Sequence, residues 1–154
     1  MYNHEPNNYI CPICIAISEK ETRDTWIKQA DIVYKDNFVT GFISSKFIKG
    51  NEGHILVVPN KHFENIYDIP EKFICYVFNV GKKIAVTLKE VRKCDGVNFV
   101  QNNEPVADQH AFHYHLHIIP RFKGDNFNEE FSKAKKSKPK DRIKYAKAIR
   151  KNLK

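Results

Sequence analysis

The sequence predicts an α+β domain in which a mostly antiparallel sheet carries helices on one side. Short runs rich in β-branched and aromatic residues surround one long helical pattern. Their order is β-β-β-α-β-β, which offers few long crossovers and therefore favours antiparallel pairing. The chain has 154 residues, the length of one ordinary domain, and 42% of them are hydrophobic, which is enough to fill a core.

The first two runs predict a β-hairpin. Residues 31–35 and 38–44 are rich in Val, Ile, Phe and Tyr, and the turn residues Asp36 and Asn37 stand between them. A short helix is expected just before the hairpin, over residues 24–30. After it, residues 54–59 form a short apolar run, which predicts a buried strand.

The main helix is predicted over residues 70–92. Apolar residues recur there at spacings of three and four, and Pro70 suits the first turn (Phe73, Val77, Val80, Ile84, Leu88, Val91). Two more strands follow, over residues 97–101 and 112–119, with a polar loop over 102–109 between them. Because loops between core strands often carry function, this loop is a candidate for substrate contacts.

Charge divides the chain at about residue 130. The formal net charge is +8, yet residues 131–154 hold eleven basic residues and one acid, so residues 1–130 are close to neutral. We therefore predict a folded domain over 1–130 and a basic C-terminal tail over 131–154. After Pro139, Asp141 is expected to cap a helix with a narrow apolar stripe (Ile143, Ala146, Ile149, Leu153).

The basic tail could bind nucleic acid or could form a helix that packs on the domain. Clustered lysines attract polyphosphate or nucleic acid. Aromatic residues that would stack on bases are nearly absent from residues 131–154, so a solvated helix docked by its apolar stripe is favoured.

Membrane insertion and export are not expected. No run approaches the roughly 20 apolar residues that span a bilayer, and the first ten residues lack a signal-peptide layout. We expect a cytoplasmic protein. In that reducing compartment the four cysteines serve as thiols or metal ligands rather than disulfides.

Three histidines alternate in the last predicted strand. On a strand, His113, His115 and His117 place their imidazoles on one face, while Tyr114 and its alternate neighbours face the core. The first and third lie about 13 Å apart along such a strand, too far for one metal ion, so the three are expected to have different roles. Neutral imidazole can attack phosphorus without a separate base, and neighbouring histidines can orient the nucleophile.

Cys11 and Cys14 have the spacing of a metal knuckle, which needs two more ligands to complete a tetrahedron. By itself this pair is a weak signal. A redox role would need a preceding strand, and only ten residues precede Cys11.

The run His113-Tyr-His115-Leu-His117-Ile-Ile resembles the signature of the histidine triad (HIT) family of nucleotide hydrolases and transferases. Residues 53–62 resemble the family's earlier strand, and residues 98–102 followed by Gln109 resemble its phosphate loop. The resemblance runs from about residue 11 to 127. It implies a five-stranded antiparallel sheet with one long helix and usually a homodimer.

The resemblance also implies a division of roles. His115 would attack the α-phosphate of a nucleotide and form a covalent nucleotidyl-histidine intermediate, with His54, His113 and His117 in support. The implied substrate contacts are six in number: Asn102, Gln109, Phe42, Ser44, His110 and Arg121. Some family members hold structural zinc through positions that correspond here to Cys11, Cys14, His62 and His113. Ser44 stands where the family often has an acid, and His110 where it usually has Ser or Thr.

Within the family, residues 117–127 are more similar to the dinucleoside polyphosphate branch than to the phosphoramidase branch. His117, where the sugar-phosphate uridylyltransferases have glutamine, argues against that third branch. The resemblance therefore implies a hydrolase that releases a nucleoside monophosphate from a dinucleoside polyphosphate or related nucleotide. Two alternatives stay open, a phosphorylase and a non-catalytic, zinc-stabilised module that binds nucleotides or nucleic acid.

Overall fold

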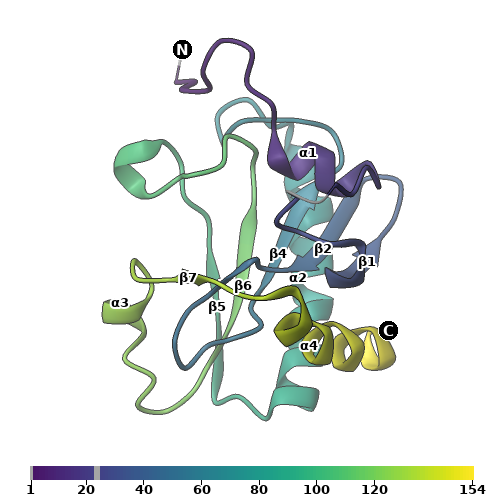
Figure 1. The fold of residues 1–154 in the computed structure, drawn as a ribbon, viewed down its shortest axis with the longest axis vertical. Helices are drawn as coiled ribbons and strands as arrows, with labels where there is room; N and C mark the ends of the chain where they lie inside the picture. The colour runs from purple at the N-terminus through teal and green to yellow at the C-terminus, as the bar shows by residue number, and fades with distance from the viewer. Residues whose placement is uncertain (1, 23–24) are drawn as a thin grey trace.

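A computed structural model describes residues 2–22 and 25–154 and contains a five-stranded antiparallel sheet. The strands lie in the order β1 (Ile32–Lys35), β2 (Val39–Ile43), β4 (Ile55–Pro59), β6 (Leu116–Arg121) and β5 (Gly96–Val100). Helix α2 (Glu71–Arg92) lies along one face of the sheet, and α4 (Pro139–Asn152) packs beside it (Figure 1). The predicted α+β fold is confirmed.

Six shorter elements complete the architecture of the described residues. They are α1 (Pro12–Ile17), the 3-10 turns η1 (Gln29–Asp31) and η2 (Pro105–Ala107), α3 (Phe127–Glu130), and a two-stranded sheet that pairs β3 (Lys46–Phe47) with β7 (Lys135–Lys136). No helix within residues 2–22 and 25–154 is long and apolar enough to cross a membrane.

The predicted hairpin forms because Asp36 closes its turn. The side-chain oxygen Oδ1 of Asp36 accepts hydrogen bonds from the backbone N–H groups of Phe38 and Val39, at 2.7 and 2.8 Å. These two bonds satisfy backbone N–H groups at the turn, and Asp is common at such positions because its side chain can accept them. β2 then pairs with β1 on one side and with β4 on the other.

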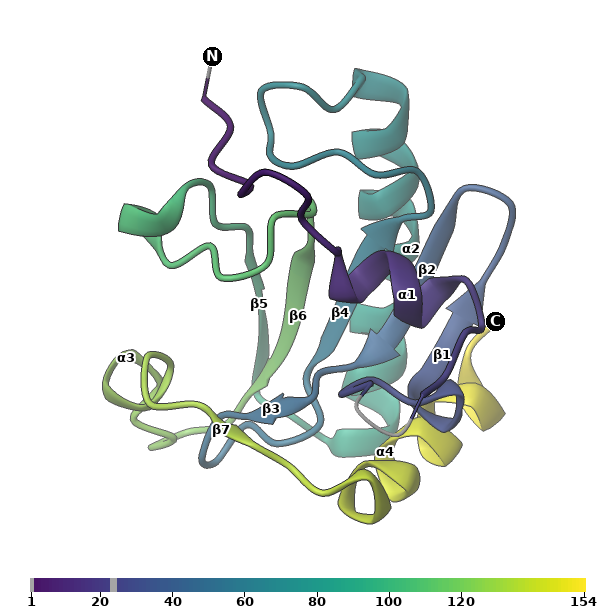
Figure 2. The ribbon, with the colours of Figure 1, turned by 45° about the horizontal axis from the view of Figure 1, so that its top comes forward.

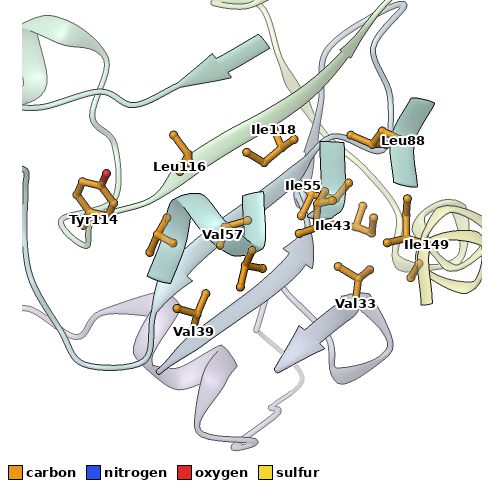
Figure 3. Close-up of a cluster of buried hydrophobic side chains, with 14 of the residues drawn as sticks. Val33, Val39, Ile43, Ile55, Val57, Leu88, Tyr114, Leu116, Ile118 and Ile149 are labelled. Carbon is orange, nitrogen blue, oxygen red and sulfur yellow. The ribbon is translucent and has the colours of Figure 1, made fainter. Parts of the chain in front are cut away.

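Side chains that alternate along the strands separate the two faces of the sheet. One face, formed by residues such as Ile43, Val57, Leu116 and Ile118, packs against α2 in the main core (Figure 3). The other face packs against α1 through Phe42 of β2 and Val58 of β4. In Figure 2, α1 and α2 lie on opposite sides of the sheet. The histidine run therefore faces the α1 side, because Tyr114 and Leu116 face α2.

The basic C-terminal segment is packed on the domain. Ala146 and Ile149 of the predicted apolar stripe are fully buried in the main core, and Leu153, just after the end of α4, packs against it. Ile143, the fourth residue of the predicted stripe, is only half-buried and belongs to no core cluster of the described residues. The helix begins at Pro139 with Lys138 at the cap, so Asp141 lies in the first turn and is not the cap. A negative charge in the first turn interacts favourably with the positive end of the helix dipole, so Asp141 still stabilises the N-terminal end of α4. The boundary at residue 130 stays a prediction.

Three expectations about the elements are wrong. The last strand begins at Leu116 and not at residue 112, because pairing with β4 starts only there and the backbone N–H of Tyr114 donates to the Phe63 carbonyl instead. Of the helix expected over 24–30, Asp24 lies outside the described residues and only a 3-10 turn from Gln29 forms. Helices cover both faces, because α1 lies opposite α2.

Candidate functional site

A cavity of about 590 Å³ opens on the α1 side of the sheet. Its walls come from α1 and the segment after it, from β3, from the loop after β5, and from residues 131–134. Small-molecule sites usually have volumes of about 300–1,000 Å³, so a nucleotide fits this one. The lining includes six residues that the sequence proposes for function: Ser44, His54, Asn102, His110, His115 and His117.

The backbone fixes the hydrogen position on His115. Its Nδ1 lies 2.7 Å from the carbonyl oxygen of His113. Because a carbonyl can only accept, Nδ1 carries the hydrogen and Nε2 keeps its lone pair. Burial lowers the pKa of His115, and the carbonyl bond opposes that shift only in part. His115 is therefore neutral and nucleophilic at pH 7 at the edge of the cavity.

His54 and His117 lie beside His115. The rings of His54 and His117 stack with 5.4 Å between centroids, and the His117 and His115 centroids are 5.1 Å apart. Burial lowers the pKa of His54 to about 3, and burial next to two other imidazoles lowers that of His117. Within the described part of the chain, Nδ1 of His54 and of His117 has no hydrogen-bond partner. Buried polar atoms normally have partners, so this end of the cavity suits a polar ligand.

Four sulfur and nitrogen atoms converge at the start of α1. The ligand atoms of Cys11, Cys14, His62 and His113 all lie within 4.8 Å of one another. The Cys11 Sγ–His113 Nδ1 and Cys14 Sγ–His62 Nδ1 distances are both 3.4 Å. A tetrahedral zinc ion with ordinary bond lengths separates sulfur from nitrogen by roughly 3.5 Å, so the spacing fits zinc.

The outer nitrogens of the two histidines also suit a metal centre. Nε2 of His113 lies 3.0 Å from the Pro59 carbonyl, and Nε2 of His62 lies 3.2 Å from a Glu5 carboxylate oxygen. Both partners accept, so each Nδ1 presents a lone pair to the cluster, as metal-bound histidines normally do. A hydrogen bond from Cys14 and the nearby His113 lower the pKa of Cys11, whereas the hydrogen bond with Cys11 and burial raise the pKa of Cys14. The pair therefore favours one thiolate, at Cys11.

The structure does not place Gln109, Phe42 and Arg121 in the cavity lining. The Gln109 amide donates to the Glu64 carbonyl at 2.6 Å and accepts from the Glu104 N–H at 2.7 Å, so it holds the loop after β5. Phe42 is fully buried behind the cavity wall. Arg121 forms two hydrogen bonds with Asp125, at 2.7 and 2.8 Å, beside a separate recess.

Sequence reasoning missed part of the cavity wall. Trp26, Lys46 and Phe131 line the cavity, and the Phe131 ring lies 5.9 Å from that of His117. Trp26 is the only tryptophan in the chain and stands in a polar stretch, which was a usable signal. Nothing local marks Lys46 or Phe131, because they reach the cavity through long-range pairing.

The HIT domain family model matches residues 27–124. The chain is 40% identical over 106 residues to an uncharacterised HIT-like protein of Methanocaldococcus jannaschii. This alignment covers 69% of this chain and 80% of that protein. It is 36% identical over 70 residues to the adenosine 5'-monophosphoramidase of Saccharomyces cerevisiae, covering 46% of this chain and 42% of the yeast protein.

Among solved structures, the fold is similar to that of a zinc-bound histidine triad family protein from Mycobacterium smegmatis. The TM-score is 0.75 at 28% identity, and the alignment covers 93% of this chain and 92% of the other. That protein holds zinc, which agrees in kind with the Cys and His cluster found in this chain.

Proposed function

Because the chain belongs to the HIT domain family, we propose that it is a nucleotide hydrolase that uses His115 to release a nucleoside monophosphate. One observation carries the proposal: the ring of His115 lines a nucleotide-sized cavity while its Nδ1 is bonded to the His113 carbonyl at 2.7 Å. This arrangement leaves Nε2 as the free nucleophilic atom.

The reaction proceeds in two displacements. The Nε2 lone pair of His115 attacks the α-phosphorus, and the bond from phosphorus to the leaving group breaks with its electron pair. The leaving group takes a proton from solvent. Water then attacks the same phosphorus, the N–P bond breaks, and water's proton is lost to solvent. The His113 carbonyl stabilises the cationic ring of the intermediate through Nδ1–H, because that bond favours the charged imidazole.

The leaving group defines two substrate classes. The similarity of residues 117–127 to the dinucleoside polyphosphate branch favours a nucleoside polyphosphate as leaving group. The yeast relative, a monophosphoramidase, favours an amine. Both substrates place the same α-phosphate before His115, so the catalytic step is common to them, and a phosphorylase would differ only in using phosphate where the hydrolase uses water.

Product analysis tests the proposal. Diadenosine tetraphosphate and an adenylated amine are incubated with the protein, with and without inorganic phosphate. A hydrolase forms AMP in both conditions, whereas a phosphorylase forms ADP only when phosphate is present. His115→Asn is expected to lower kcat by at least about 10³-fold, while the control His4→Asn, an exposed histidine outside the cavity lining, retains full activity. Equal turnover by wild type and His115→Asn would overturn the mechanism.

The same proposal includes a structural zinc ion and a cytoplasmic location. Cys11, Cys14, His62 and His113 would supply all four ligands, which leaves no open position for catalysis, so the ion supports the fold. It would fasten the N-terminal segment to the backbone that precedes His115. A reducing cytoplasm would keep both thiols available.

A homodimer is also part of the proposal. β5 is an edge strand of the five-stranded sheet, and the exposed rings of Phe78 and Phe99 stack beside it at 5.9 Å. Exposed strand edges and apolar patches favour pairing with another chain. Analytical ultracentrifugation is expected to show a dimer for wild type and a monomer for Phe99→Asp. A monomeric wild type would contradict this assembly.

A further inference from the structure

We propose that Trp26 is a substrate-binding residue that stacks on a nucleobase of the bound nucleotide. The inference rests on the proposed function and deepens it. Trp26 lines the same cavity as His115, and 48% of its surface is exposed, although it is the only tryptophan in the chain. An indole that faces a ligand cavity is a natural stacking surface, because every base has a π-face.

The backbone of Trp26 is held in place by a buried charge. Nη2 of Arg142 donates to the Trp26 carbonyl at 2.8 Å, and the same nitrogen lies 2.8 Å from Asp31 Oδ2. The Arg142 side chain has no exposed surface, and that of Asp31 is 1% exposed. The backbone of Trp26 is therefore held by an interaction that solvent does not screen, which limits the movement of the residue that carries the ring.

The C-terminal strap, residues 131–137, contacts the Trp26 ring through Lys136. Nη1 of Arg142 donates to the Ser137 carbonyl at 2.9 Å, and Nζ of Lys136 lies 4.2 Å from the centroid of the Trp26 ring. β7 within the strap lies beside β3 and pairs with it (Figure 2). Lys136 therefore lies opposite Lys46, which itself lines the cavity. One face of the indole is thus taken by a cation, which places a base on the remaining exposed surface.

The surrounding wall fits a base and its phosphates. The cavity that Trp26 lines is also lined by apolar side chains, among them Ile13, Ile27 and Leu56. Lys46 and Lys136 are like charges directly across a strand pair, an arrangement that is unfavourable unless an anion lies nearby. An aromatic ring beside apolar residues and two cations matches the chemistry of a nucleotide better than that of an uncharged ligand.

Tryptophan fluorescence tests the inference directly. AMP and ribose 5-phosphate are titrated into the wild type, and diadenosine tetraphosphate into His115→Asn, which blocks turnover, with calorimetry run in parallel. AMP is expected to quench the emission at the midpoint that calorimetry gives, whereas saturating ribose 5-phosphate leaves it unchanged. Quenching by AMP assigns Trp26 to the transferred nucleotide, and quenching only by the dinucleotide assigns it to the leaving group. Either result supports stacking.

Variants complete the test. Trp26→Ala is expected to weaken AMP binding by about 5- to 150-fold, the equivalent of about 1–3 kcal/mol for one stacked base. Trp26→Phe retains most of the affinity, and the control Tyr76→Ala, an exposed aromatic residue on α2, retains all of it. The inference is overturned if the nucleotides bind without any change in emission, or if Trp26→Ala binds AMP and, in the His115→Asn background, diadenosine tetraphosphate as tightly as the protein with Trp26. If no nucleotide binds by calorimetry, the proposed function fails, and the inference fails with it.

Discussion

Replacing Arg142 with Met should cost about 3–5 kcal/mol of unfolding free energy. Arg142 and Asp31 form a buried ion pair, with Nε to Oδ1 at 2.9 Å and Nη2 to Oδ2 at 2.8 Å. Removing one partner of such a pair leaves an uncompensated charge in the interior, which accounts for that range. The carbonyls of Trp26 and Ser137 also lose their donor, so the loss should lie toward the upper end.

Urea unfolding followed by circular dichroism measures the loss, and thermal unfolding should show a fall in Tm of about 6–20 °C for a chain of this size. Arg150→Met is the matched control, because Arg150 lies on the same helix and donates to the Ala30 and Ile32 carbonyls from an exposed position. It should cost less than about 1 kcal/mol. If Arg142→Met costs no more than Arg150→Met, the reasoning that the buried pair fastens the C-terminal segment is refuted.

Three further predictions concern protons, zinc and backbone strain. The pKa of His54 is about 3 when folded and about 6.5 when unfolded, so between these values the unfolded chain binds more protons and stability falls as pH drops. Urea midpoints from pH 7 to 4 should show a shallower slope for His54→Asn, and an unchanged slope would argue against a buried neutral ring. Native mass spectrometry should find one zinc ion per chain in the wild type and none in Cys14→Ser, whose unfolding free energy falls by several kcal/mol; full retention of zinc would contradict the four-ligand site. Gly53→Ala should lose at least about 2 kcal/mol, because φ is +77° and a Cβ would lie 2.5 Å from Tyr145 Cγ. Gly124→Ala, with φ of +81° and no atom within 4 Å, should lose only about 1 kcal/mol, and equal losses would show that the Tyr145 contact is unimportant.

Features set by local periodicity were predictable from the sequence. The spacing of Val77, Ile84 and Leu88 predicts α2 to within one residue, because a helix repeats its buried face every three or four residues. The alternation around His115 predicts which side chains face the core, and this held even though the strand itself starts at Leu116.

Features set by long-range contacts were not predictable. Arg142 stands in a lysine-rich run that looks solvated, and its burial depends on Asp31, more than a hundred residues earlier. Gln109 has the position of a phosphate contact, yet its amide is satisfied by the backbone of Glu64 and Glu104. Asp31 and Glu64 lie far along the chain from Arg142 and Gln109, and no local pattern encodes these contacts.

Intact-mass spectrometry of the reaction intermediate tests the central claim most directly. Wild-type protein mixed with diadenosine tetraphosphate and quenched during turnover should carry one acid-labile adenylyl group, and peptide mapping should place it on His115. His115→Asn should carry none and should not turn over. An unmodified wild type, together with His115→Asn that hydrolyses the substrate at the wild-type rate, would contradict the account.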